Sequence, residues 1–177
     1  MAEMLVLVDE RDNPIGYEEK MKAHQNGGHL HRAFSIFVFN SRNEVLLQLR
    51  SREKHHFRNL WTNPCCSHPR KGEKLEEAVH RKLKQEFGFD TPLKEIFSFT
   101  YKALDEDSGL TEHEFDHVFV GRYNGLPKPN PEEIDDWKWI SVRDLRNDLE
   151  RNPERYTPWS KIAFERLLKQ LPDVLPS

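Results

Sequence analysis

The residues best suited to chemistry stand together near the middle of the chain, in the segment NPCCSHP at positions 63–69. Thiols and an imidazole this close together can transfer protons or bind a metal ion. If residues 61–68 are extended, their side chains alternate between two faces, so that Cys66 and His68 share one face and Cys65 lies on the other. We therefore predict that Cys66 rather than Cys65 works beside His68.

Further imidazoles and carboxylates could join His68. His24 and His31 stand on either side of a glycine-containing turn, and Glu112 and Glu114 lie two positions apart in a predicted strand, where they share one face. Three imidazoles and two carboxylates form a donor set that suits Mn²⁺, Zn²⁺ or Mg²⁺. The five residues are far apart in the sequence and form no compact ligand motif, and a Glu-x-Glu pair is more often the solvated side of a sheet. The set therefore indicates either a metal site or polar residues on the solvated side of a sheet.

A helix is predicted directly after this segment, over residues 73–87. Its apolar residues recur at helical spacing, and Gly88 follows as a C-terminal cap. Its charged residues can form an ordinary solvated face with ion pairs. The helix N-terminus nevertheless follows the Cys/His segment, and unpaired amides at such an end favour an anion. A basic run at residues 50–58 precedes that segment, and it suits either a solvated loop or a phosphate site, with a diphosphate as the natural ligand.

Composition limits the classes of protein that this chain can represent. Its 177 residues suffice for one domain, which we expect to cover residues 1–177, and a net charge of -3 argues against a general nucleic-acid or membrane binder. The sequence has no apolar run of about 18 residues and no signal-peptide pattern at its start. Its two cysteines are adjacent and cannot close a useful disulfide loop. We expect a cytoplasmic protein, monomeric or weakly dimeric, that binds neither nucleic acid nor membrane.

The elements that would position these groups come in the order strands, helix, strands, helices. Because the strands come in hairpins, the order favours an α/β (α+β) sandwich with a mixed sheet flanked by helices over a doubly wound parallel sheet. The predicted strands cover residues 4–8, 31–40, 44–49, 94–103, 111–123 and 136–140. The predicted helices cover residues 18–24, 73–87, about 142–149, after the cap Ser141, and a last segment that opens at residues 157–159.

The central helix resembles a degenerate Nudix box, the glycine, glutamate and arginine signature of that fold. Ser67 stands where the box has its first glycine, Lys82 replaces the glutamate after the arginine, and Gln85 replaces the first of two paired glutamates. Hydrolytic members use these glutamates to gather divalent ions around a diphosphate, so the replacements argue against hydrolysis. The matching residues are Gly72-Glu73, Arg81, Leu83, Glu86 and Gly88-Phe89.

Nearly the whole chain resembles the type 1 isopentenyl-diphosphate Δ-isomerases, a family with the Nudix fold. The matching segments are residues 22–24, 30–35, 60–63, 66–69, 99–103, 112–114 and 157–159. The resemblance implies a small-molecule diphosphate substrate and a metal site that holds Mn²⁺ or Zn²⁺. By this resemblance the metal ligands are His24, His31, His68, Glu112 and Glu114. It further implies that Glu86 holds a Mg²⁺ that bridges to the diphosphate, and that the phosphate contacts are Arg50, Lys54 and Lys82.

The chemistry of such an isomerisation matches the residue types. Moving an unactivated double bond needs one proton added and another removed through a carbocation-like state, in a pocket that excludes water. The resemblance makes Cys66 and Glu114 the catalytic pair, while Tyr101 can relay or orient a proton and Trp159 can present an indole face to the cation. We predict that Glu114, with Tyr101, donates the proton in the direction that gives dimethylallyl diphosphate, and that Cys66 as thiolate receives one.

Two alternatives remain open at this point. The first is a Nudix hydrolase of a diphosphate-containing metabolite, against which Lys82 and Gln85 speak. The second is a non-catalytic metal-binding module in which Cys66 joins the histidines as a structural ligand. Ser67 is a further question, because the isomerases commonly have glycine at this position and a side chain could crowd the loop.

Overall fold

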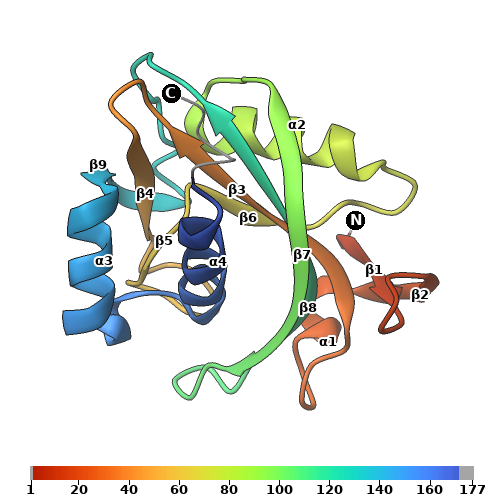
Figure 1. Ribbon diagram of the computed structural model, residues 1–177. Coiled ribbons are helices and arrows are strands. Elements are labelled where there is room, and N and C mark those ends of the chain that lie inside the picture. Colours follow the sequence, from red (N-terminus) through yellow and green to blue (C-terminus); the bar gives the residue numbers. More distant parts are fainter. Residues whose placement is uncertain (1, 172–177) are drawn as a thin grey trace.

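The structure of the protein is a computed structural model that describes residues 2–171. Within that range the chain forms one nine-stranded mixed sheet with helices on both of its faces, as the order of elements predicts (Figure 1). The strands are β1 Met4–Val8, β2 Pro14–Glu19, β3 His31–Phe39, β4 Glu44–Arg50, β5 Trp61–Thr62, β6 Cys65–Ser67, β7 Leu93–Leu104, β8 Thr111–Arg122 and β9 Ile134–Ser141. The helices are α1 Lys20–Ala23, α2 Leu75–Phe87, α3 Val142–Arg151, the 3-10 turn Pro153–Arg155 and α4 Pro158–Lys169.

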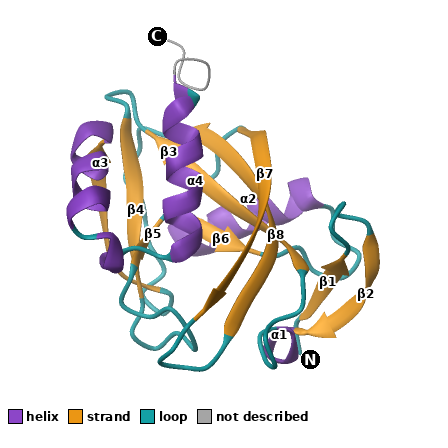
Figure 2. Cartoon of the chain, turned by 60° about the horizontal axis from the view of Figure 1, so that its bottom comes forward, coloured by secondary structure: helices purple, strands orange, loops and turns teal. Residues whose placement is uncertain are grey.

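Strand β3 is the centre of the sheet. It lies parallel to β8 from the His31/Glu114 pair to the Phe39/Arg122 pair, while β7 and β8 form the predicted antiparallel hairpin. Strands β3 and β4 pair only beside their turn, at Phe39 and Val45. Beyond that pair they diverge, because β3 also pairs with β6 whereas β4 pairs with β5 and β9. The sheet therefore splays open, and α4 lies in the space between its two halves (Figure 2).

The alternation of side chains along β3 supplies both layers of the core. Phe34 and Ile36 face α2, where they pack with Leu83. Phe37 points to the opposite face and meets Phe164 of α4 with a ring-centroid distance of 4.8 Å. A strand whose two faces are both covered must be apolar at successive positions, and that is why residues 33–39 read as a continuous apolar run with one serine. The two helices thus fix the sheet from opposite sides.

Three local predictions need correction. Residues 18–24 are helical only over Lys20–Ala23, because Glu18 and Glu19 complete strand β2, which pairs with β1. The segment 61–68 is not one extended strand: β5 pairs with β4 and β6 pairs with β3. Helix α2 begins at Leu75, since Glu73 turns back and accepts hydrogen bonds from the Arg70 amide and the Arg81 guanidinium.

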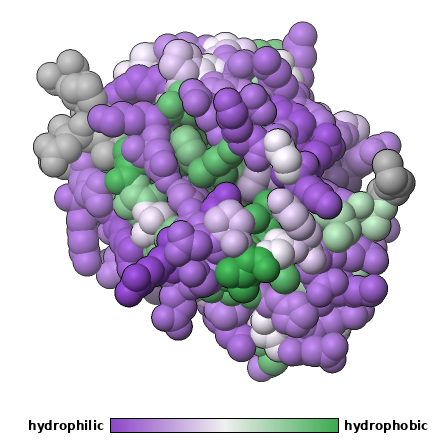
Figure 3. Space-filling model, turned by 90° about the vertical axis from the view of Figure 1, so that its right-hand side faces the viewer, coloured by the Kyte–Doolittle hydropathy of each residue, from purple (hydrophilic) through white to green (hydrophobic). Residues whose placement is uncertain are grey.

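The surface is mostly polar, with apolar side chains in small separate patches on the face that Figure 3 presents. The most exposed large apolar side chains are those of Ile15, Leu104 and Leu126. Among the described residues, every helix is too short or too polar to cross a bilayer.

Asn63 holds the break between β5 and β6 in place. Its side-chain amide donates to the carbonyls of Ile36 and Cys65, and its oxygen accepts a hydrogen bond from Thr62. All four of these residues are fully buried.

We expect Asn63→Ala to lower the free energy of unfolding by about 1–3 kcal/mol, because two buried carbonyls would lose their donor. Urea unfolding measures the loss. Asn147→Ala, on the exposed face of α3, is the matched control and should leave stability nearly unchanged; equal stability of both variants would contradict the assignment.

Candidate functional site

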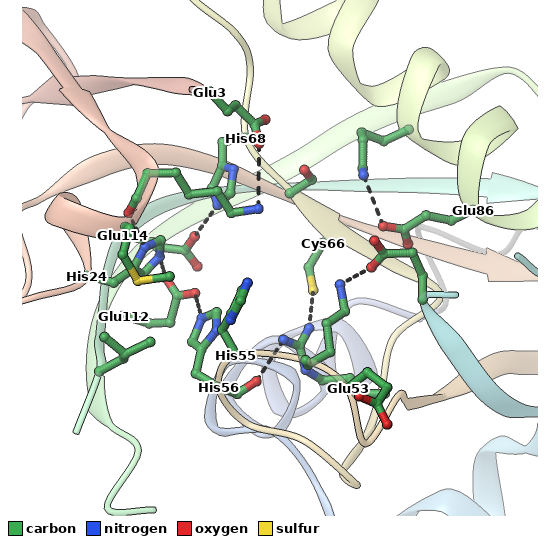
Figure 4. Close-up of a pocket in the computed structure, with 18 of the residues that line it drawn as sticks. Glu3, His24, Glu53, His55, His56, Cys66, His68, Glu86, Glu112 and Glu114 are labelled. Atoms are coloured by element: carbon green, nitrogen blue, oxygen red, sulfur yellow. Dashed lines mark hydrogen bonds and ion pairs between the residues drawn. The ribbon is translucent and has the colours of Figure 1, made fainter. Parts of the chain in front are cut away.

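The candidate site is a pocket of about 420 Å³ between the β3/β8 half of the sheet, helix α2 and the loop after β4. Its wall on one side carries His24, Glu112 and Glu114, and Glu86 lies on the opposite side. Cys66 lies between these two sides, with its sulfur directed into the space between them (Figure 4). The pocket therefore contains acidic, basic and thiol groups within one small volume.

Strand register brings three of the predicted residues together. The parallel pairing of β3 with β8 sets His31 beside Glu114, and the antiparallel pairing of β7 with β8 sets Tyr101 on the other side of the same glutamate. Glu112 lies two positions before Glu114, so both carboxylates point to one face of the sheet. His68 follows β6, which pairs with β3 at Ser67 and Phe34. Residues from β3, from β7 and from the end of β6 thus converge on the two carboxylates of β8.

Backbone carbonyls fix the imidazoles of His24 and His31. His24 Nδ1 lies 2.6 Å from the Lys20 carbonyl and His31 Nδ1 lies 2.8 Å from the His29 carbonyl. A carbonyl only accepts, so each Nδ1 carries a proton and each Nε2 is turned toward the carboxylates. Burial acts to lower the pKa of both imidazoles, but the adjacent Glu112 and Glu114 carboxylates outweigh it and raise the pKa. The distances are 3.0 Å from His24 Nε2 to Glu112 Oε2 and 3.2 Å from His31 Nε2 to Glu114 Oε2. At these distances a proton or a metal ion must lie between each Nε2 and the carboxylate oxygen opposite it.

This arrangement fits a divalent metal ion. His24, His31 and His68 each offer a ring nitrogen within 4.8 Å of the others, and His31 forms a second such group with Glu112 and Glu114. His68 Nδ1 is buried without a hydrogen-bond partner among the described residues. Backbone carbonyls behind ligand imidazoles are the usual outer support of a metal site, because they fix the tautomer and the ring orientation. The donor set alone does not select among Mn²⁺, Zn²⁺ and Mg²⁺.

The two carboxylates differ in proton affinity. Burial and the adjacent Glu112 carboxylate raise the pKa of Glu114 above its usual value, although His31 and Tyr101 oppose this. Burial also acts to raise the pKa of Glu112, but hydrogen bonds from His24 and His56 outweigh it and hold that pKa well below the usual range. Tyr101 donates a hydrogen bond to Glu114 Oε1, and burial raises the pKa of the phenol well above 10. The structure therefore makes Glu114 the carboxylate that binds a proton more readily.

The two cysteines have different surroundings, as the alternation predicts. Cys65 is fully buried in the core beneath α2, whereas Cys66 lines the pocket. Burial raises the pKa of the Cys66 thiol to about 12, and the Arg50 guanidinium acts in the opposite direction. Arg50 Nη1 lies 4.0 Å from Cys66 Sγ. Arg50 is thus the positive group that favours a thiolate at this position.

An aromatic group closes the pocket behind these residues. Trp159 lies in the first turn of α4, and its indole lies 6.0 Å from the Tyr101 ring and 5.3 Å from the Phe57 ring, measured between centroids. The Arg50 guanidinium carbon lies 5.3 Å from the Trp159 ring centroid. The Trp159 Nε1 atom is buried without a partner among residues 2–171. The predicted indole face is present, and part of it is already covered by a cation.

The predicted phosphate contacts also line the pocket, but each already has a protein partner. Lys54 forms an ion pair with Glu133, and Lys82 Nζ lies 3.3 Å from Glu86 Oε1. Arg50 donates to the carbonyls of His56 and Phe57 at 3.0 and 2.9 Å. The two lysines are available to an anion that displaces their carboxylates, whereas Arg50 is mainly occupied with the loop.

Two residues near the site, His56 and Asp116, were not predicted from the sequence, and the structure also answers the question about Ser67. His56 contacts Glu112, although the basic run gave no spacing signal for this, because it lies in an irregular loop. Asp116 continues the carboxylate face of β8 and accepts a hydrogen bond of 2.7 Å from Ser35, and the two-residue period could have located it. Ser67 lies in strand β6 with a negative φ, so the backbone at this position does not require glycine.

Comparison with known proteins identifies relatives along almost the entire chain. Residues 29–160 match the NUDIX domain family. A protein of Photorhabdus laumondii called isopentenyl-diphosphate Delta-isomerase 2 is 51% identical over 96% of this chain and 95% of its own length. A protein of Aromatoleum aromaticum with the same name is 48% identical over 95% of this chain and 88% of its own length.

Solved structures of lower identity share the fold. A crystal structure from Deinococcus radiodurans aligns with a TM-score of 0.76 at 22% identity, covering 93% of this chain and 98% of that chain. A MutT protein from Methanosarcina mazei aligns with a TM-score of 0.66 at 20% identity, covering 80% of this chain and 94% of that one.

The different surroundings of the two thiols give a direct test of the pocket. We expect a small alkylating reagent to modify one thiol per native chain, because Cys66 lines the pocket and Cys65 is fully buried. Cys66→Ala should abolish this labelling and Cys65→Ala should preserve it, as measured by intact-protein mass spectrometry. Labelling of Cys65 first, or of both thiols at one rate, would contradict the assignment.

Proposed function

The chain belongs to the isopentenyl-diphosphate Delta-isomerases of the NUDIX domain family, and we propose that it interconverts isopentenyl diphosphate and dimethylallyl diphosphate by adding one proton and removing another. The observation that carries this proposal is that a thiol, Cys66, and a carboxylate with raised proton affinity, Glu114, line one pocket together with cationic side chains. A proton donor, a proton acceptor and an anchor for an anion are the three parts that the reaction needs.

Glu114 supplies the first proton. In the direction that gives dimethylallyl diphosphate, its carboxylic acid protonates the terminal methylene carbon of the substrate, and positive charge develops on the tertiary carbon. Burial, which raises the pKa of Glu114, supports this role because the neutral acid is the form that donates. Tyr101 holds Glu114 by a hydrogen bond and keeps its own proton because its pKa is raised. We assign Tyr101 to orienting the carboxyl group and relaying its proton.

Cys66 removes the second proton. As thiolate it takes a proton from the carbon next to the tertiary centre, the electrons of that C–H bond form the new double bond, and the thiol results. One proton has entered the substrate and one has left, so the product is an isomer. Burial raises the pKa of this thiol to about 12, so the thiolate depends on positive charge nearby, and the Arg50 guanidinium lies 4.0 Å from the sulfur. In the reverse direction Cys66 donates and Glu114 accepts.

The rest of the pocket protects and anchors the substrate. Trp159 offers an aromatic face to the developing cation, and its position against Phe57 and Tyr101 helps to exclude water. Lys54 and Lys82, with Arg50 behind them, are the proposed contacts of the diphosphate. When bound, Mn²⁺ or Zn²⁺ at the His/Glu cluster and Mg²⁺ at Glu86 would supply positive charge, the first beside Glu114 and the second beside the diphosphate. His24, His31, His68, Glu112 and Glu114 would hold the first ion.

Two other functions have less support. A hydrolase of the NUDIX fold needs paired glutamates, but Gln85 replaces one of them and Lys82 forms an ion pair with the glutamate that remains, Glu86. A structural metal module needs a cysteine ligand, yet within the described range the groups of potential ligand atoms contain only histidine and glutamate. The Cys66 sulfur instead lies 4.0 Å from the Arg50 guanidinium.

The first test is incubation of the purified protein with isopentenyl diphosphate, Mg²⁺ and Mn²⁺ or Zn²⁺ in D₂O, followed by NMR. We expect dimethylallyl diphosphate that carries deuterium in a methyl group, because the donated proton comes from solvent through Glu114. Removal of the metals with a chelator should stop the reaction, and their return should restore it. Unchanged substrate with the metals bound, or release of phosphate from a panel of nucleoside diphosphate derivatives, would contradict the proposal.

Substitution of the two proton-transfer residues gives the second test. We expect Glu114→Gln and Cys66→Ala each to lower kcat by about 10²–10⁴-fold, the usual contribution of a positioned acid or base. Cys65→Ala is the matched control and should retain activity, since Cys65 lies in the core beneath α2. Circular dichroism and metal content verify that each variant is folded and loaded. Near-normal turnover of Glu114→Gln would remove that residue from the mechanism.

A further inference from the structure

The loop between β4 and β5 brings an additional imidazole to the metal cluster. His56 Nε2 hydrogen-bonds to Glu112 Oε1. The other oxygen of the same carboxylate, Oε2, lies 3.0 Å from His24 Nε2 and 3.7 Å from His31 Nε2. Glu112 is therefore held from two sides, with one oxygen facing the cluster and the other facing His56. Figure 4 shows His56 and Glu112 next to each other at the edge of the pocket.

The loop that carries His56 is held by contacts on several sides. The Arg50 guanidinium donates to the carbonyls of His56 and Phe57, and the Phe57 amide donates to Asp105 Oδ2 at 3.1 Å. The Phe57 ring is buried and meets Trp159 edge to face. Phe57 has a φ of 48°, a backbone conformation that a bulky residue adopts only where the surroundings impose it. The position of His56 is therefore set by the fold of the loop.

His56 is better placed to support a ligand than to bind a second ion. His24 Nδ1 is committed to the Lys20 carbonyl, so His24 has one nitrogen to offer, and that nitrogen faces Glu112 Oε2. His24, His56 and Glu112 do offer ligand atoms within 4.8 Å of one another, but His24 also belongs to the group with His31 and His68 and has a single nitrogen for both. When His24 binds the ion of that cluster, a second ion between His56 and Glu112 would have only these two residues as ligands. A carboxylate oxygen only accepts, so the imidazole of His56 donates through Nε2–H to Oε1.

We propose that His56 is a positioning residue of the metal site: its hydrogen bond to Glu112 Oε1 turns Oε2 toward the ion and strengthens metal binding. This role depends on the metal site of the proposed function. Outer hydrogen bonds of this kind contribute about 10–100-fold in metal affinity, because the ligand no longer has to be ordered when the ion binds. Arg50 then connects two parts of the site, since it holds the His56 loop and also lies 4.0 Å from the Cys66 sulfur.

A matched pair of variants isolates the hydrogen bond. Glutamine and methionine have similar length and volume, but only glutamine can donate to Glu112, so we compare His56→Gln with His56→Met. The dissociation constants of Zn²⁺ and Mn²⁺ are measured by competition with a chromophoric chelator. We expect His56→Met to weaken binding about 10–100-fold and His56→Gln to stay close to the unmodified protein. His55→Met, at the neighbouring exposed position that lines the same pocket, should have no effect.

Each result decides between this role and another. Equal affinity in His56→Met and the unmodified protein would overturn the proposal. Equal loss in both His56 variants, with a changed visible spectrum of bound Co²⁺, would make His56 a direct ligand and would also overturn it. Absence of metal binding in the unmodified protein would refute the metal site itself, whereas isomerase activity with an unaffected His56→Met affinity would refute only the role of His56. Thermal unfolding without metal confirms that the variants fold.

Discussion

Two carboxylates, Glu112 and Glu114, are buried beside each other on one strand, and the organisation of the site depends on compensating their charge. Both side chains are at least nine-tenths buried. A buried carboxylate without a partner costs several kcal/mol, so the surrounding groups must supply protons, cations or donors. Backbone carbonyls accept from the Nδ1 atoms of His24 and His31, so these rings compensate the carboxylates only through a proton or a metal ion at Nε2. A divalent ion or a bound proton meets the requirement, and the proposed chemistry uses both.

The same constraint separates the roles of the two glutamates. Glu112 accepts a hydrogen bond from His56, and its other oxygen shares a proton or a metal ion with His24 Nε2, so both contacts stabilise its charged form. Glu114 lies against Tyr101, and its neighbour Glu112 makes a second full negative charge unfavourable. A pair of adjacent carboxylates with different surroundings is a common way to obtain one metal ligand and one proton donor from the same residue type.

The splayed sheet makes room for these groups. If β3 and β4 paired along their whole length, as a regular hairpin does, β6 could not lie beside β3 and Cys66 could not reach the pocket. The gap is filled by α4, whose first turn brings Trp159 against Tyr101 and Arg50. Helix α2 packs on the other face and carries Glu86 and Lys82 to the opposite side of the pocket. The sheet thus keeps the Cys66 thiol out of the core and places it between Glu114 on one side of the pocket and Glu86 with Lys82 on the other.

The sequence by itself determined the features that depend on short-range periodicity. Residue alternation put Glu112 with Glu114 and separated Cys66 from Cys65, helical spacing located α2 to within two residues at its start, and the motifs indicated the family. Only the tertiary structure decided the parallel pairing of β3 with β8, the division of residues 61–68 into two strands, and the contact of His56 with Glu112. A local pattern fixes which face a side chain occupies, because that follows from backbone geometry. The distant segment that packs against that face is decided by competition among alternative long-range contacts, and local spacing in the sequence does not predict the outcome.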